Sequence, residues 1–239
     1  MAGKGQRTMK YGSCKQLIKV ENKYVVEWFF LSIKNNINVL DDFIFITTLE
    51  YENKFDFSNT IKTILIKYDI HNNVRFIFSD DTPEGPASSV YLAKEYVLSD
   101  DPCIVANSDQ FIYFELPSFD LKNSIYLPLN LDFNQSKSYV GIKKDKVTEI
   151  VEKENISNIA SSGIYLFSSG KDMILALEEQ FLSKKTVNNE YYIAPAINSL
   201  IKKGYDVYPI PVIVKFDLGT VIGIDLFNHF LVDIFKKGL

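Results

Sequence analysis

The sequence predicts an α/β protein whose mixed, mostly parallel sheet is flanked by helices. Two observations support this prediction. Short runs rich in β-branched and aromatic residues alternate along the chain with segments of helical periodicity, which is typical of strands joined by helical crossovers. The 239 residues are also 46% hydrophobic and 23% charged, which suits one globular domain with a sizeable core. We therefore expect a single domain over 1–239, with halves of about 1–112 and 113–239.

The individual elements follow from the local patterns. The predicted strands are Phe43–Thr48, Val74–Ser79, Cys103–Asn107, Ser138–Lys143, Ile164–Phe167 and Val207–Val212. The predicted helices, in which apolar residues recur with amphipathic spacing, are Tyr24–Asn36, Ala87–Val97, Lys171–Leu182 and Ile193–Lys203. Residues Glu115–Lys137 are polar and irregular, which indicates an insertion or crossover.

Charge and cysteine content exclude several classes of protein. The net charge of −4 provides no overall basic surface for a nucleic acid or an anionic membrane. Two cysteines, Cys14 and Cys103, indicate neither a disulfide framework nor a CxxC metal site, and they fit a reducing cytoplasm. No apolar run approaches the roughly 18 residues of a membrane span, and the basic start lacks the apolar region of a signal peptide. We expect a soluble, cytoplasmic protein.

The first 20 residues contain four Lys, one Arg and no acidic residue. In Gly3-Lys4-Gly5, glycine would let backbone N–H groups approach a phosphate, and Arg7 and Lys15 would neutralise its charge. A flexible basic terminus is the alternative. Loops of this kind normally follow a buried strand, and none precedes this one. Either the sequence lacks its natural N-terminus or another segment occupies that position.

Two aspartates follow apolar runs. Asp109 ends the segment that begins at Cys103, and Asp217 lies in Phe216-Asp217-Leu218-Gly219. Ligands of open α/β sheets lie beyond the carboxyl ends of strands, where carboxylates can bind a hard cation such as Mg²⁺. Taken singly, each aspartate could equally be a turn residue. As a pair they are more consistent with a metal that bridges phosphates.

Further polar groups lie in three later segments. The turn in Thr82–Ser89 precedes a predicted helix and could bind the edge of a base or an anion. Clusters of this composition usually only cap helices. Lys153 could hold an acceptor phosphate, and Glu190 could accept hydrogen bonds from hydroxyls. Solvated surface charges are the alternative for this pair.

Taken in order, these segments resemble the sugar-phosphate nucleotidyltransferases, above all the glucose-1-phosphate thymidylyltransferase type and its capsule-biosynthesis relatives. The matching segments are MAGKGQR, CKQLIKV, PEGPASS, NSDQFIY, VEKENISN and FDLGT, which extend over nearly the whole chain. Two departures are Cys14, where the family usually has Pro or Ser, and Glu154 or Asn155, where it often has Pro. These departures bear on the acceptor more than on the reaction.

The resemblance implies a Rossmann-like, GT-A-like nucleotidyltransferase with Mg²⁺ as cofactor, a nucleotide-binding N-terminal half and an acceptor-binding C-terminal half. It implies catalytic roles for Arg7, Lys15 and Asp109, and metal binding by Asp109 and Asp217. The implied nucleotide-binding residues are Ala2, Gly3, Gly5, Gln6, Gly85, Pro86 and Ser108. The implied acceptor-binding residues are Glu152, Lys153, Gly163 and Glu190.

The expected reaction joins a nucleoside triphosphate to a sugar 1-phosphate or similar phosphorylated metabolite and releases pyrophosphate, for capsule or surface polysaccharide precursors. A pyrimidine nucleotide such as CTP, dTTP or UTP is expected. No nucleic-acid or membrane partner is expected, and a homo-oligomer is left open. One alternative is a glycosyltransferase of similar fold, but that class would carry Asp-x-Asp where this chain has Ser108-Asp109-Gln110. A catalytically silent binding subunit is the other.

Overall fold

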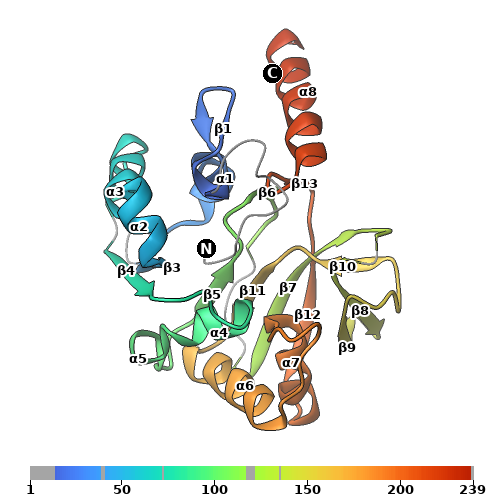
Figure 1. Ribbon diagram of the computed structural model, residues 1–239. Helices are drawn as coiled ribbons and strands as arrows, with labels where there is room; N and C mark the ends of the chain where they lie inside the picture. Colours follow the sequence, from blue (N-terminus) through green and yellow to red (C-terminus); the bar gives the residue numbers. More distant parts are fainter. Residues whose placement is uncertain (1–13, 39–40, 72, 117–121, 135, 238–239) are drawn as a thin grey trace. The chain divides into compact units, whose positions relative to one another are not determined.

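A computed structural model describes residues 14–38, 41–71, 73–116, 122–134 and 136–237, and for residues 232–237 it describes the backbone alone (Figure 1). The chain divides into two compact units. Unit 1 comprises Met1–Asp81, Asn107–Tyr113 and Ile213–Leu239, and unit 2 comprises Thr82–Ala106 and Phe114–Val212. Each unit is built from segments that are distant in sequence, so the units do not coincide with halves divided near residue 112.

Within the described residues, unit 1 contains three two-stranded sheets and several helices. Its elements are η2 (Lys15–Leu17), β1 (Lys19–Val20), β2 (Lys23–Tyr24), α1 (Val25–Ile33), η3 (Lys34–Asn36), β3 (Phe43–Thr48), α2 (Leu49–Phe55), α3 (Phe57–Lys67), β4 (Val74–Ser79), β6 (Gln110–Tyr113), β13 (Val214–Asp217) and α8 (Val221–Lys237). Strands β3 and β4 pair in parallel, whereas β1 with β2 and β6 with β13 pair antiparallel.

Two apolar clusters hold unit 1 together. In one, buried residues of α1 and α3, including Phe30 and Ile61, pack against Phe45 of β3. In the other, Trp28 of α1 contacts Phe227 of α8 edge to face, with ring centroids 5.1 Å apart. Helix α1 therefore has two buried faces, which fits its run of bulky apolar residues.

Glu27 connects the start of α1 to the end of α3. Its carboxylate accepts a hydrogen bond of 2.6 Å from the backbone N–H of Tyr24 and so caps the helix. The same carboxylate lies 2.7 Å from the ammonium of Lys67 and accepts a hydrogen bond from the Tyr68 hydroxyl. Burial by itself would raise the pKa of Glu27, but these partners outweigh it and hold the pKa below its ordinary value.

In unit 2, seven of the described strands form one sheet. The elements of unit 2 are α4 (Pro86–Tyr91), α5 (Lys94–Val97), β5 (Cys103–Ala106), β7 (Ser124–Leu131), β8 (Ser138–Lys143), β9 (Lys146–Glu152), β10 (Ile159–Ser161), β11 (Ile164–Phe167), α6 (Gly170–Ser183), α7 (Ile193–Lys202) and β12 (Asp206–Pro211). The strand order is β5-β11-β7-β10-β8-β9, and β12 pairs with β7. Helices α6 and α7 pack against this sheet through a buried apolar cluster (Figure 1).

The predicted α/β class with helices flanking a sheet is confirmed. The expectation of mostly parallel pairing is wrong for the described strands, because only β3 with β4 and β7 with β12 are parallel there. The predicted helix Ala87–Val97 is divided into α4 and α5. None of the helices within the described residues is long and apolar enough to span a membrane.

The prediction of an insertion or crossover over Glu115–Lys137 is wrong for residues 124–131. These residues form β7, which pairs with three other strands and has six consecutive buried residues. Helices α2, α3 and α8 and strands β6, β9, β10 and β13 were not predicted either.

Candidate active site

The pairing of β6 with β13 places the two predicted metal-binding aspartates at one end of a small sheet. Asp217 is the last residue of β13 and lies opposite Gln110, the first residue of β6. Asp109 immediately precedes Gln110 and therefore lies at the same end. Strand register thus brings together two residues that are more than a hundred positions apart in sequence.

A glycine makes room for both carboxylates. A Cβ atom added to Gly219 would lie 2.4 Å from Oδ2 of Asp109 and 3.2 Å from Oδ1 of Asp217. The two carboxylate oxygens therefore converge on the same small volume, which no larger residue would leave open. The backbone N–H of Gly219 also donates a hydrogen bond of 3.1 Å to Oδ1 of Asp217, which orients that carboxylate.

The turn that follows Asp217 is fixed by the start of α8. The hydroxyl of Thr220 donates to the backbone carbonyl of Asp217 and accepts a hydrogen bond from the backbone N–H of Gly223, both at 3.1 Å. The second contact is the geometry of a helix N-cap. The capped helix therefore holds Asp217 and Gly219 in place.

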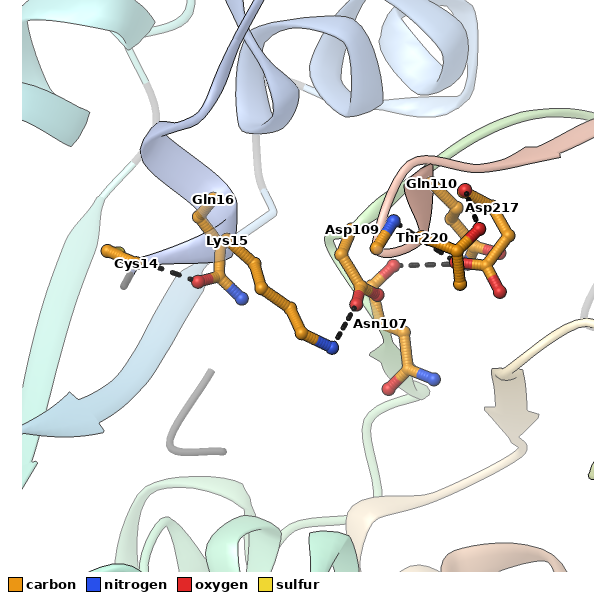
Figure 2. A network of polar contacts seen from close by, with 9 residues as sticks. Cys14, Lys15, Gln16, Asn107, Asp109, Gln110, Asp217 and Thr220 are labelled. Carbon is orange, nitrogen blue, oxygen red and sulfur yellow. Dashed lines mark hydrogen bonds and ion pairs between the residues drawn. The ribbon is translucent and has the colours of Figure 1, made fainter. Parts of the chain in front are cut away.

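Lys15 reaches the same acidic pair from η2. Its Nζ lies 3.5 Å from Oδ2 of Asp109 (Figure 2). The same oxygen is the nearest atom to a Cβ added at Gly219. The side chains of Lys15 and Asp109 are 23% and 27% exposed, so the ion pair is partly shielded from water. Buried neighbours on both sides, Cys14 and Gln16, anchor the short helix that carries Lys15.

The segment between β5 and β6 is also constrained. Gln110 is buried, and its side-chain amide donates a hydrogen bond of 3.0 Å to the backbone carbonyl of Asn107. Ser108 is buried as well, and its hydroxyl has no hydrogen-bond partner in the part of the chain that the structure describes. A buried hydroxyl without a partner is costly unless a ligand or water satisfies it.

In unit 2, the turn that contains Gly85 is bonded to the segment around Tyr191. The backbone N–H of Tyr191 donates to the carbonyl of Glu84 at 2.9 Å, and the N–H of Ala87 donates to the carbonyl of Tyr191 at 3.0 Å. Gly85 has a φ of +99°, and a Cβ there would lie 2.5 Å from the Tyr191 carbonyl oxygen. Glycine is therefore required by the backbone of Tyr191. Pro86 follows at the first turn of α4, where its missing N–H costs nothing.

Lys153 and Glu190 belong to a three-residue polar network. The ammonium of Lys153 donates a hydrogen bond to the hydroxyl of Tyr192, which in turn donates to the carboxylate of Glu190. Lys153 also lies 4.0 Å from Oε2 of Glu190 and 4.5 Å above the Tyr192 ring. The φ of Lys153 is +58°, a left-handed conformation that is unusual for a non-glycine residue and often marks functional sites.

Two other predicted acceptor residues lie at neighbouring strand ends. Glu152 ends β9, is buried and accepts a hydrogen bond from the hydroxyl of Ser138. Burial raises its pKa, although this hydrogen bond and the nearby positive charges oppose the rise. Gly163 separates β10 from β11 with a φ of +84°, and its N–H donates to the Ser161 hydroxyl at 3.1 Å.

Comparisons with known proteins give the fold. No protein-family model matches the sequence, and no curated protein sequence matches it. A solved nucleoside-diphosphate-sugar pyrophosphorylase from Vibrio cholerae RC9 is similar in structure with a TM-score of 0.82 and 23% identity, over 96% of this chain and 98% of that one. The chain has the nucleotidyltransferase fold.

Two other solved structures of this kind are also similar. A UDP-glucose pyrophosphorylase complexed with UDP-glucose has a TM-score of 0.74 and 16% identity, over 97% of this chain and 96% of that one. A CTP:phosphocholine cytidylyltransferase from Streptococcus pneumoniae has a TM-score of 0.69 and 17% identity, over 96% of each chain. At these identities the similarity establishes the nucleotidyltransferase fold, and the reaction has to be inferred from the site.

On this nucleotidyltransferase fold, the predicted residues form two groups. Unit 1 brings Lys15, Asp109 and Asp217 together. Unit 2 brings Gly85 next to Glu190, which is close to Lys153. Tyr192 was not predicted, although its position two residues after Glu190 placed it in a segment already singled out. Ala2, Gly3, Gly5, Gln6 and Arg7 lie outside the described residues.

The residues of unit 1 fit a magnesium ion. The described part of the chain contains no cluster of three or more His, Cys, Asp or Glu that could hold a metal. Mg²⁺ does not need one, because it is commonly bound through one or two carboxylates together with water and substrate phosphates. Asp109 and Asp217 supply two such carboxylates, and the absent side chain of Gly219 leaves space beside them.

Proposed function

We propose that this protein is a magnesium-dependent nucleotidyltransferase that joins a nucleoside triphosphate to a sugar 1-phosphate or a similar phosphorylated metabolite. The observation that carries this proposal is the convergence of Asp109 and Asp217 beside Gly219, with Lys15 paired to Asp109. Two carboxylates and a lysine suit the binding of a metal–triphosphate complex. The nucleotidyltransferase fold adds support, since the similar solved structures include a pyrophosphorylase and a cytidylyltransferase.

The proposed reaction needs little acid–base chemistry from the protein. An oxygen of the acceptor phosphate attacks the α-phosphorus of the nucleotide, and the bond between that phosphorus and the bridging oxygen of the leaving pyrophosphate breaks. A phosphate monoester has a second pKa of about 6, so the nucleophile is already largely a dianion at neutral pH. Catalysis then consists mainly of positioning and of neutralising the charge on the phosphates.

Each group of residues has a role in this scheme. Asp109 and Asp217 would hold Mg²⁺, which supplies a Lewis acid that neutralises phosphate charge. Lys15 contributes a further positive charge to the triphosphate, and Arg7 is proposed to do the same. Lys153 binds the acceptor phosphate, whereas Glu190 and Tyr192 hydrogen-bond acceptor hydroxyls.

The proposal also covers the kind of nucleotide, the use of the product and the remaining binding residues. We infer a pyrimidine nucleotide, CTP, UTP or dTTP, because the sequence resembles pyrimidine-using enzymes and two of the similar structures are named for UDP-glucose and CTP. Synthesis of capsule or surface polysaccharide precursors is inferred from the same resemblance, and a cytoplasmic location is inferred from the low cysteine content. Gly85, Pro86 and Ser108 are proposed to bind the nucleotide, and Glu152 and Gly163 to line the acceptor site.

The two alternative functions have less support. A glycosyltransferase would be expected to carry Asp-x-Asp after the strand, and here the residues two positions before and after Asp109 are Asn107 and Phe111. A silent binding subunit would be expected to lose part of the charged site. This chain keeps all three residues: Lys15 pairs with Asp109, and the carboxylates of Asp109 and Asp217 converge beside Gly219.

A substrate screen tests the proposal directly. Pyrophosphate release would be measured for CTP, UTP, dTTP, ATP and GTP, each with a panel of sugar phosphates, polyol phosphates and phosphocholine, in the presence of Mg²⁺. We expect one pyrimidine nucleotide with one class of phosphorylated acceptor to give turnover. If no pair releases pyrophosphate, the proposed function is wrong.

The metal assignment has its own test in the Asp109→Asn variant. Loss of this carboxylate should lower kcat by at least about 10²-fold at saturating Mg²⁺, with the fold preserved by circular dichroism. Asp69→Asn is the matched control, because Asp69 lies in the same unit and its side chain is 87% exposed. A near-normal rate of Asp109→Asn would contradict the role of Asp109.

A further inference from the structure

Lys15 is paired with one of the two carboxylates that are proposed to hold the metal. Its ammonium lies 3.5 Å from Oδ2 of Asp109, and that oxygen is the atom that would lie 2.4 Å from a Cβ at Gly219. The direction of the Lys15 side chain toward Asp109 is visible in Figure 2. One positive charge is thus already placed against the acidic pair of Asp109 and Asp217.

The backbone of Lys15 is held, whereas its charged end can move. The N–H of Leu17 donates to the carbonyl of Cys14 at 3.1 Å, and the N–H of Ile18 donates to the carbonyl of Lys15 at 3.3 Å. Cys14, Gln16 and Ile18 are buried around it. The four-carbon stem of lysine is flexible, so the ammonium can change partner without any change in the helix that carries it.

We propose that Lys15 is an internal counter-ion of the metal site, so that the protein binds a divalent cation weakly until a triphosphate draws the ammonium away from Asp109. This inference rests on the proposed function, because it takes Asp109 and Asp217 as the metal-binding pair. A metal held by Asp109 would lie close to the ammonium of Lys15, and two cations at short range repel each other. The partial shielding of Lys15 and Asp109 from water would strengthen that repulsion.

A bound triphosphate would end the competition between Lys15 and the metal for Asp109. It offers Lys15 several anionic oxygens, and once the ammonium is bound to them Asp109 can give its full charge to the metal. Because coupling between two ligands is reciprocal, the metal then increases the affinity for the triphosphate by the same factor. The metal and the nucleotide would therefore bind together as a complex. A metal ion without nucleotide would rarely displace Lys15 from Asp109.

Binding of Mn²⁺ alone to the full chain tests this inference without any measurement of activity. Mn²⁺ affinity would be measured by electron paramagnetic resonance in the absence of nucleotide. We expect the Lys15→Met variant to bind Mn²⁺ about tenfold more tightly than the unmodified protein, because the competing charge is gone. Lys15→Arg, which keeps the charge, should bind Mn²⁺ as weakly as the unmodified protein.

Lys19→Met is the matched control. Lys19 lies four residues away in β1, is exposed, and has its ammonium 5.4 Å above the Tyr24 ring. Removing this charge should leave Mn²⁺ affinity unchanged. If Lys15→Met binds Mn²⁺ no more tightly than the unmodified protein, or if Lys19→Met has the same effect as Lys15→Met, the counter-ion role is overturned.

A further variant separates this inference from the proposed metal site. In the Lys15→Met background, Asp109→Asn should abolish the tightened Mn²⁺ binding. If Mn²⁺ binding is unaffected by Asp109→Asn in either background, Asp109 is not a metal ligand and the proposed metal site itself fails. If binding depends on Asp109 but not on Lys15, the metal site stands and only the counter-ion inference fails.

Discussion

At the scale of single residues, the proposed metal site depends on the absence of a side chain at Gly219. Gly219 has no left-handed backbone conformation, so the backbone alone would accept alanine there. Its Cβ would nevertheless lie within 2.4 Å of Oδ2 of Asp109. The collision would fall on a carboxylate that can rotate, and that rotation would take it away from Asp217.

Gly219→Ala should therefore reduce activity without unfolding the protein. We expect kcat to fall by at least about 10²-fold while the free energy of unfolding stays within about 1 kcal/mol. Steady-state kinetics and thermal denaturation would measure both quantities. Gly223→Ala provides the contrast, because its Cβ would lie 1.8 Å from the backbone carbonyl oxygen of Asp217 and the chain would have to distort. Equal loss of stability in both variants would contradict this difference.

The sequence was informative about residues whose chemistry is tied to a strand end. Asp109 and Asp217 could be predicted as a pair because each follows an apolar run, and Lys15 because it lies in a basic segment. Tyr192 could not be predicted as a partner of Lys153. The two residues are 39 positions apart, and no local sequence pattern marks the left-handed backbone of Lys153.

At the scale of elements, the turn at Gly85 and the segment around Tyr191 behave as one structure. Tyr191 is held by backbone hydrogen bonds to the carbonyl of Glu84 and from the N–H of Ala87, and its neighbours Glu190 and Tyr192 contact Lys153. A residue predicted to contact the nucleotide therefore also positions the side chains proposed for the acceptor. This connection was not visible in the sequence, because the two segments are about a hundred residues apart.

Gly85→Ala should damage the acceptor site as well as the fold. We expect a loss of at least about 2 kcal/mol in the free energy of unfolding and a higher KM for the acceptor, because the new Cβ would displace Tyr191. Gly204→Ala is the matched control: its φ is +88°, yet nothing lies within 4 Å of an added Cβ. The Gly204→Ala variant should lose about 1 kcal/mol of unfolding free energy, because alanine is strained in this backbone conformation. Its KM for the acceptor should stay unchanged. Chemical denaturation and steady-state kinetics would compare them, and equal effects would show that Tyr191 is not displaced.

Some strands were predicted with their observed bounds, whereas the central strand β7 was missed. Phe43–Thr48 and Val74–Ser79 were predicted with the observed bounds of β3 and β4. Strand β7 was missed because the segment Glu115–Lys137 around it is polar and irregular. It also contains Pro128, although proline is rare in central strands. In this sheet Pro128 lies where the neighbour of β7 changes from β11 to β10, and its carbonyl accepts a hydrogen bond from the N–H of Ser162. Pro128 therefore lies outside the paired residues of β7 with β10 and of β7 with β11, and its missing N–H interrupts neither pairing.

At the scale of the whole molecule, acid stability depends on buried carboxylates such as Glu27. Its pKa in the folded protein lies below the ordinary value of 4.5, because Lys67, Tyr24 and Tyr68 together outweigh the effect of burial. A lowered pKa means that the contribution of Glu27 to stability is complete above about pH 4.5 and is lost as the pH falls through the folded pKa.

The Glu27→Gln variant tests this dependence. We expect it to lose about 1–3 kcal/mol of unfolding free energy at pH 7, because a charged partner of Lys67 becomes neutral inside unit 1. The difference from the unmodified protein should shrink as the pH falls below about 4.5, where the natural carboxylate also becomes protonated. Urea denaturation at a series of pH values would measure it. A difference that stays constant with pH would show that the carboxylate charge is not responsible.

The division into units was the feature of the whole molecule that the sequence revealed least. Periodicity and composition predict elements and a core, but they do not show which distant segments pack together. Asn107–Tyr113 and Ile213–Leu239 join Met1–Asp81 in unit 1 because β6 pairs with β13 and because α8 packs on α1. Such long-range pairing has no local signal along the chain.

This interleaving sets an order of events during synthesis. All the segments of unit 2 precede Ile213, so a growing chain has them available before the ribosome has made β13. Strand β6 meanwhile leaves the exit tunnel with its partner still untranslated, and its edge is open to mispairing until Val214–Asp217 emerges. Chaperone capture of nascent chains is consequently expected to concentrate on this interval of translation.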